Sequence, residues 1–165
     1  FGFERWEDWD VDLFEKIEES LLSKTRDFHH KIMGFDKSPS DVEKAIQNVE
    51  NAKLDDFIYI KHEDFFKTQK GGEAHLHMVF NPPYGERLDI EMETFYGAIG
   101  STLKHKYPGT NAWMISSNLE ALKHIGLRPS RKIKLFNAKL EARFQKYEMY
   151  AGSKKTHKLG VKNNN

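Results

Sequence analysis

The chain has 165 residues, of which 38% are hydrophobic and 31% are charged. This length suffices for one domain with a core, and no apolar run approaches the roughly 20 residues that cross a bilayer. No cysteine is present, which excludes disulfides and thiolate metal sites and suits a reducing compartment. We therefore predict a cytoplasmic protein with no membrane segment.

The net charge of +1 conceals two halves of opposite sign. Residues 1–64 hold 17 acidic and 9 basic side chains, whereas residues 65–165 hold 8 acidic and 17 basic ones. Residues 123–162 contain twelve Lys or Arg residues, whereas their acidic residues are Glu141 and Glu148 alone. The basic residues of the second half could bind along a phosphate backbone, or they could be ordinary solvated surface cations. We expect residues 151–165 to be a flexible basic tail.

The first half of the chain alternates between helical and extended patterns. Apolar residues spaced by three and four predict a helix over roughly 10–25. Ser38 and Pro39 begin a second helix as its N-cap and first turn, and this helix runs to about Ala52. Strands are predicted over 31–36, 57–60 and 76–80.

The second half continues the alternation and closes with a hairpin. A helix signalled over 92–103 stops before Pro108 and Gly109. The remaining elements are a strand over 112–115, a short helix over 119–125, and strands over 132–136 and 140–150. This order predicts an α/β fold: a mostly parallel, doubly wound sheet with right-handed crossovers and an antiparallel C-terminal hairpin.

A double proline ends the strand over 76–80. Asn81, Pro82, Pro83 and Tyr84 follow this strand directly. Each proline lacks an N–H and fixes φ near −65°, so the strand stops and a stiff loop begins. Ligands of open α/β sheets bind at this edge. A loop with an amide, carbonyls and an aromatic ring suits a planar molecule that carries an amino group; the alternative is an ordinary strand-ending turn.

Two acidic residues follow the preceding strands at the same edge. Asp36 comes where a carboxylate accepts hydrogen bonds from ribose hydroxyls, and Asp64 could accept from an adenine amino group. Alternatively, Asp36 complements a helix N-terminus and Asp64 is a loop acid. His75 and His77 alternate on one strand without a third partner at suitable spacing, so no metal site is predicted.

In this order, Asp36, Asp64 and the Asn-Pro-Pro-Tyr loop resemble class I S-adenosylmethionine-dependent methyltransferases that modify exocyclic amines. Longer stretches resemble one bacterial family, which methylates guanine N2 in 23S ribosomal RNA and is often labelled an N6-adenine-specific DNA methylase. These stretches are FGFERW (1–6), NPPYGERL (81–88), IGLRPSRKIKLFN (125–137) and Leu140-Glu141. The resemblance makes residues 1–150 a partial methyltransferase catalytic domain with a Rossmann-like sheet.

The resemblance implies roles for particular residues. Asp36 would hold the ribose of S-adenosylmethionine and Asp64 its adenine amine. Phe65 would lie against the adenine ring face, or it could be a core residue. Asn81 would also contact the cofactor. The catalytic residues would be Asn81, Pro82, Pro83 and Tyr84. In this scheme Tyr84 stacks on the extruded base, and Asn81 and Pro82 accept from its amine. Candidate nucleic-acid contacts are Arg87, Arg128, Arg131 and Lys132, although each could be an ordinary surface cation.

One family feature has no counterpart in this sequence. Family members carry, upstream of the FGFERW stretch, a strand and an Asp-Pro-x-Cys-Gly-Ser-Gly turn that holds the methionine part of the cofactor. We therefore expect a sheet that is incomplete between the strands ending at Asp36 and Phe80, with two unpaired edges. Completion would require the missing N-terminal half of the same protein, and catalysis by this chain alone is not expected.

Three functions remain open from the sequence. The first is methylation of guanine N2 in ribosomal RNA, and the second is methylation of adenine N6 in DNA, because the Asn-Pro-Pro-Tyr form serves both bases. The third is a non-catalytic RNA-binding module that keeps the fold without cofactor binding.

Overall fold

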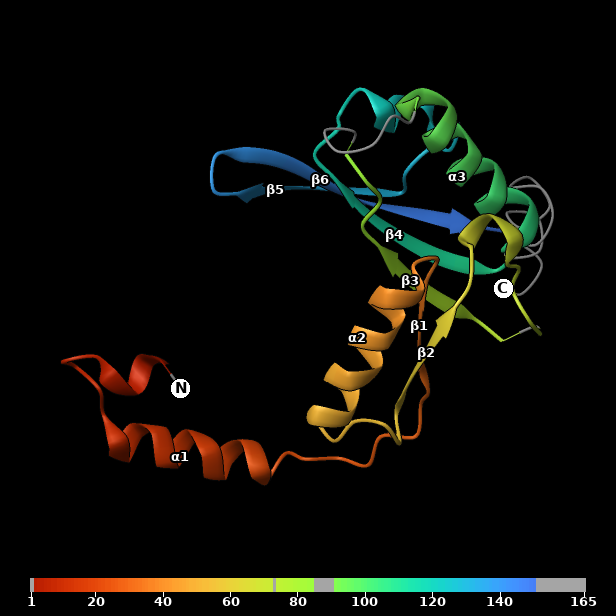
Figure 1. Cartoon of the computed structure of the whole chain (residues 1–165). Helices are drawn as coiled ribbons and strands as arrows, with labels where there is room; N and C mark the ends of the chain where they lie inside the picture. Colours follow the sequence, from red (N-terminus) through yellow and green to blue (C-terminus); the bar gives the residue numbers. More distant parts are fainter. Residues whose placement is uncertain (1, 73, 85–90, 151–165) are drawn as a thin grey trace, which may run out of the picture.

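The computed structural model describes residues 2–72, 74–84 and 91–150 (Figure 1). Its helices are α1 (Val11–Leu22), α2 (Pro39–Asn51) and α3 (Met92–Lys106), and its 3₁₀ helices are η1 (Gly2–Arg5), η2 (Phe65–Lys67) and η3 (Ala121–Ile125). Its strands are β1 (Ile32–Asp36), β2 (Ile58–His62), β3 (Leu76–Phe80), β4 (Thr110–Ser116), β5 (Arg131–Asn137) and β6 (Leu140–Met149). No helix in this described part combines the length and apolar character needed to span a membrane. The expected basic tail lies outside the described residues.

The strands form two sheets of different size. Strands β1 and β2 pair in parallel, with α2 as their crossover, and the larger sheet has the order β3-β4-β6-β5. Within it β3 and β4 are parallel, whereas β6 is antiparallel to both β4 and β5. The C-terminal hairpin turns through two residues, and the first, Ala138, has a φ of 52° as a tight hairpin turn requires. The mixed α/β architecture with a closing hairpin is therefore confirmed.

The two sheets are separated where the sequence predicts a missing strand. Among the described strands, β1 pairs only with β2 and β3 pairs only with β4. One edge of β1 and one edge of β3 therefore lack a strand partner. Unpaired edges expose rows of N–H and C=O groups that a further strand would satisfy. The described strands thus divide into the pair β1–β2 and the sheet that begins at β3, as expected for a sheet that is incomplete between these two groups.

Most of the hydrophobic core lies in the C-terminal unit, which we define as the described residues from Phe65 to Tyr150. Helix α3 and η3 pack on the large sheet and bury Tyr96, Leu103, Met114 and Tyr147 completely. Gly100 permits the close contact between α3 and η3, because a Cβ there would lie 1.6 Å from the carbonyl oxygen of Ile125. Bulkier residues at this position would push the two helices apart.

The N-terminal unit, residues 2–64, contrasts with this packing. Val42 is its one buried hydrophobic residue. Along α1 the apolar residues Leu13, Ile17 and Leu21 are exposed, and Figure 1 shows this helix apart from both sheets. The periodicity that predicts α1 is thus correct. On the face that it creates, Phe14 packs against aromatic rings from the segment before the helix, whereas the other apolar residues stay exposed.

Candidate active site

The NPPY loop (residues 81–84) leaves the carboxyl end of β3. Pro82 is buried, Tyr84 is half-buried and Asn81 is exposed. The Tyr84 hydroxyl donates a short hydrogen bond to Asn81 Oδ1. The amide oxygen that the sequence predicts as an acceptor is therefore occupied by a neighbouring side chain in this structure.

The loop is tied to the core through Tyr96. The Tyr96 hydroxyl donates to the carbonyl oxygen of Pro83 at 3.2 Å and lies 2.6 Å from Ser116 Oγ. Both Tyr96 and Ser116 have no exposed surface. Burial raises the pKa of Tyr96, and this effect exceeds the opposing one of the Ser116 hydrogen bond. The phenol therefore keeps its proton and remains a donor at neutral pH.

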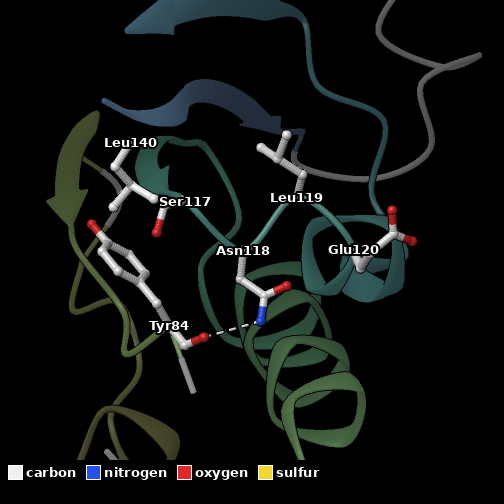
Figure 2. A pocket seen from close by; sticks show the side chains of 6 residues that line it. All are labelled: Tyr84, Ser117, Asn118, Leu119, Glu120 and Leu140. Atoms are coloured by element: carbon white, nitrogen blue, oxygen red, sulfur yellow. Dashed lines mark hydrogen bonds between the residues drawn. The ribbon is translucent and has the colours of Figure 1, made fainter. Parts of the chain in front are cut away.

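A second connection runs through Asn118, just beyond β4. Its Nδ2 donates to the carbonyl oxygen of Tyr84 at 3.1 Å, and its Oδ1 accepts from the Ala121 N–H at 2.9 Å. Its own N–H donates to Ser116 Oγ at 3.1 Å. One side chain thus joins the NPPY loop to the start of η3, and Figure 2 shows its bond to Tyr84.

A pocket of about 330 Å³ opens beside the loop. Figure 2 shows the Tyr84 ring and the Ser117 hydroxyl on one side of it, with Leu140 of the β5–β6 hairpin above. It is lined by Tyr84, Ser117, Asn118, Leu119, Glu120 and Leu140. This volume falls at the lower end of the range of small-molecule sites, and its aromatic wall suits a planar ligand.

The two acidic residues lie together at the carboxyl edge of the small sheet. Asp36 pairs in register with His62, and the Glu63 N–H donates to its carbonyl oxygen, so Asp64 follows close by. Asp36 Oδ1 accepts from the Ser38 N–H at 2.7 Å. Asp64 Oδ1 accepts from the Phe66 N–H at 3.0 Å. Each carboxylate therefore supports the turn after its strand, and cofactor contacts by these residues remain predictions.

Phe65 packs among aromatic rings. Its ring stacks on Phe80 and on Tyr107, both with centroids 5.8 Å away. This packing fits the core alternative for Phe65, and its contact with a cofactor ring remains a prediction. Ser38 occupies the N-cap position of α2 with Pro39 as the first helical residue, but its side chain makes no capping bond.

The candidate phosphate contacts lie on and before β5. Arg128, Arg131 and Lys132 are all exposed. Lys132 and Lys134 share one face of the strand, where Lys134 Nζ bonds to Glu141 at 2.7 Å. Arg87 lies outside the described residues. The hairpin thus carries exposed cations at the start of β5, while Leu140 at its turn helps to line the pocket.

Metal-ligating side chains are dispersed over the described ranges. Within them, no three His, Asp or Glu side chains are grouped to hold a metal ion. His75 Nε2 instead lies 2.9 Å from Asn111 Nδ2, and its ring packs edge-on against that of His77.

The fold defines a class of protein. SMU.472, which carries a provisional methyltransferase name and was crystallised with SAH, superposes with a TM-score of 0.76 and 23% identity, over 93% of this chain and 41% of its own. A structure from Listeria monocytogenes named as a predicted N6-adenine-specific DNA methylase superposes with a TM-score of 0.68 and 24% identity. The match covers 88% of this chain and 38% of that structure. The fold is that of an α/β methyltransferase.

The sequence comparisons narrow this class. The UPF0020 family model (RMKL-like, methyltransferase domain) matches residues 6–146, and the chain belongs to this family. Ribosomal RNA large subunit methyltransferase K/L of Shewanella frigidimarina is 32% identical over 161 residues, covering 93% of this chain and 22% of the relative. Its counterpart in Hahella chejuensis is also 32% identical, and the match covers 91% of this chain and 22% of that relative. The chain therefore spans about a fifth of these relatives.

Sequence reasoning missed part of this site. The polar run of Ser116, Ser117 and Asn118 follows β4 at the same sheet edge as the NPPY loop. That position was a usable signal, because the carboxyl ends of parallel strands meet at one edge. Tyr96 gave no such signal, since it occurs within the apolar face of a helix.

Proposed function

We propose that this chain forms part of the catalytic domain of an S-adenosylmethionine-dependent enzyme that methylates an exocyclic amine of a nucleobase, guanine N2 in 23S ribosomal RNA. The observation that carries the proposal is the NPPY loop, fixed at the carboxyl end of β3 by Tyr96 and Asn118 and bordering a pocket. The family membership and the ribosomal RNA methyltransferase names of its relatives support it.

The loop residues would act on a base extruded from its stack. The base lies against the Tyr84 ring, and its amine donates to Asn81 Oδ1 and to the Pro82 carbonyl. In the structure Asn81 Oδ1 already accepts from the Tyr84 hydroxyl, and its second lone pair would accept from the amine. The two acceptors then draw the amine toward tetrahedral geometry and aim its lone pair. Well-oriented reactants gain roughly 7–11 kcal/mol from such positioning.

S-adenosylmethionine, when bound, supplies an electrophilic methyl group. The donor set at the edge of the small sheet fits such a group, because carboxylates match ribose hydroxyls and an adenine amine. Asp36 would hold the ribose and Asp64 the amine, with Phe65 at the ring face. The break in the sheet separates β1 and β2, which the two acids follow, from β3, which Asn81 follows. We propose that the N-terminal half of the same protein inserts a strand there and adds the turn for the methionine part.

The RNA backbone would follow the basic hairpin. Arg128, Arg131 and Lys132 are exposed on and before β5, and Arg87 follows the NPPY loop in the sequence. Cations on a strand face can track a phosphate backbone without reading its sequence.

The test uses the protein expressed from its whole gene. Labelled S-adenosylmethionine is supplied with unmodified 23S ribosomal RNA or with duplex DNA, and the labelled nucleoside is identified. We expect label in N2-methylguanine of the RNA. Label in N6-methyladenine of DNA would establish the alternative enzyme. RNA binding without cofactor binding would establish the non-catalytic module, which the break in the sheet favours.

A further inference from the structure

We infer that Tyr96, Ser116 and Asn118 are positioning residues that hold the NPPY loop in its working shape. The inference rests on the proposed function, because the shape matters for methyl transfer. These three residues come from α3 and from the end of β4, and none is part of the motif that they support.

The loop depends on outside donors for a chemical reason. Pro82 and Pro83 have no N–H, so this segment can form few backbone bonds of its own. Its two consecutive carbonyls, those of Pro83 and Tyr84, are instead bound by the Tyr96 hydroxyl and the Asn118 amide. These two bonds do not involve the oxygens of Asn81 and Pro82, which are the acceptors in the proposed reaction.

The two hydroxyls share a 2.6 Å contact in which either can be the donor. Each hydroxyl has a single proton. In the arrangement that satisfies the Pro83 carbonyl, Tyr96 donates to that carbonyl at 3.2 Å and Ser116 donates to Tyr96. Ser116 in turn accepts from the Asn118 N–H. The result is one chain of donors from Asn118 through Ser116 and Tyr96 to Pro83, which removal of either hydroxyl breaks.

Two buried residues nearby provide matched controls. Tyr147 is as fully buried as Tyr96, but its hydroxyl donates to Gln145 Oε1 at 2.6 Å instead of to the loop. Thr110 lies on β4 like Ser116, and its buried hydroxyl has no hydrogen-bond partner among the described residues. Each control deletes a buried hydroxyl from the same layer without touching the chain of donors.

The experiment compares Tyr96→Phe with Tyr147→Phe, and Ser116→Ala with Thr110→Val, in the protein expressed from its whole gene. Steady-state methyl transfer gives kcat and the two KM values, and peptide-level hydrogen exchange follows residues 76–84. We expect Tyr96→Phe and Ser116→Ala to lower kcat roughly 10–100-fold, as sub-ångström misplacement does, and to speed exchange across residues 76–84. The cofactor KM of these two variants should stay within about twofold of wild type. The kcat and exchange rates of the two control variants should also stay within about twofold of wild type.

The two measurements separate the inference from the function it rests on. If wild type transfers no methyl group, the proposed function fails, while the exchange comparison still decides whether these residues hold the loop. Equal kcat and equal exchange in Tyr96→Phe and Tyr147→Phe would overturn the inference. Asn118→Ala, which releases the Tyr84 carbonyl, provides a second variant should Ser116→Ala fail to fold, and it should show the same kcat loss with unchanged cofactor KM.

Discussion

The two units of this molecule differ in how much of their apolar surface they bury. The C-terminal unit encloses Tyr96, Leu103 and Met114 between α3 and a four-stranded sheet. The N-terminal unit buries only Val42 and leaves Leu13 and Leu21 of α1 more than half exposed. A two-stranded sheet with one crossover helix cannot cover both of its faces. The contrast is between one unit with an enclosed core and one whose apolar side chains are largely uncovered by the described residues.

The same division runs through the candidate site. The acceptor residues of the NPPY loop belong to the C-terminal unit, where buried hydroxyls and an amide fix them. Asp36 and Asp64, the candidate cofactor contacts, belong to the N-terminal unit. The proposed function thus combines a preformed acceptor with a cofactor side that is completed only when the gap between β1 and β3 is filled.

The largest difference between the two units should appear when one leucine of each is replaced by alanine. Leu103→Ala empties a fully buried position and should lower the free energy of unfolding by about 2–5 kcal/mol. Leu21→Ala, at a position that is 62% exposed, should change it by less than about 0.5 kcal/mol. Urea denaturation of the two variants measures both values. A loss of several kcal/mol for Leu21→Ala would mean that α1 is packed in solution and would break the comparison.

A slightly smaller loss is expected from overpacking α3 against η3. Gly100→Ala places a methyl group 1.6 Å from the carbonyl oxygen of Ile125 and should cost about 3 kcal/mol. Gly97→Ala, in the same helix, meets the His124 carbonyl oxygen at an ordinary 3.5 Å, so it should be neutral or slightly stabilising. Thermal unfolding of the pair measures the difference, and equal melting temperatures would refute the close contact.

Alkaline pH should weaken the C-terminal unit through its buried tyrosines. Burial raises the pKa of Tyr96 and Tyr147 above the usual value of 10. Above pH 10 the unfolded chain loses these phenolic protons while the folded chain keeps them, so stability falls as pH rises. The slope is about 1.4 kcal/mol per pH unit for each tyrosine. Urea unfolding between pH 8 and 11 should show a shallower fall in Tyr147→Phe; an unchanged slope would contradict the buried assignment.

The smallest effect tests the charge contrast. Lys132→Ala on the basic hairpin should weaken RNA binding modestly and reduce the salt slope by about 1, as loss of one phosphate contact does. Lys44→Ala, which removes an exposed lysine of α2 paired with Asp41, should leave the slope unchanged. Binding isotherms at several salt concentrations give both slopes. Identical salt slopes in wild type and Lys132→Ala would show that Lys132 on the hairpin does not contact an RNA phosphate.

Local chemistry made much of the fold readable from the sequence. The strand at Leu76–Phe80 has the predicted bounds, because the double proline after it ends a strand unambiguously. Helix α3 continues to Lys106, beyond the last apolar residue that signals it, because helices extend until a breaker such as Pro108. The break between β1 and β3 was also predictable, since it follows from the family resemblance and the absent glycine turn.

What could not be read from the sequence depends on contacts between distant segments. Tyr96 has the helical spacing of a core residue, and nothing local shows that its hydroxyl reaches a carbonyl 13 residues away. The short helix over 119–125 is a 3₁₀ helix that begins where Asn118 accepts from Ala121. The bond between Tyr84 and Asn81 likewise depends on side-chain rotamers, which a motif does not specify.

The most direct test of the central claim is the kinetics of Asn81→Ala in the protein expressed from its whole gene. If Asn81 accepts the target amine, kcat should fall roughly 100–1,000-fold, as for loss of one group that stabilises a transition state. Cofactor affinity measured by calorimetry should stay within about twofold of wild type. Unchanged kcat, or equal loss of turnover and cofactor binding, would contradict the account.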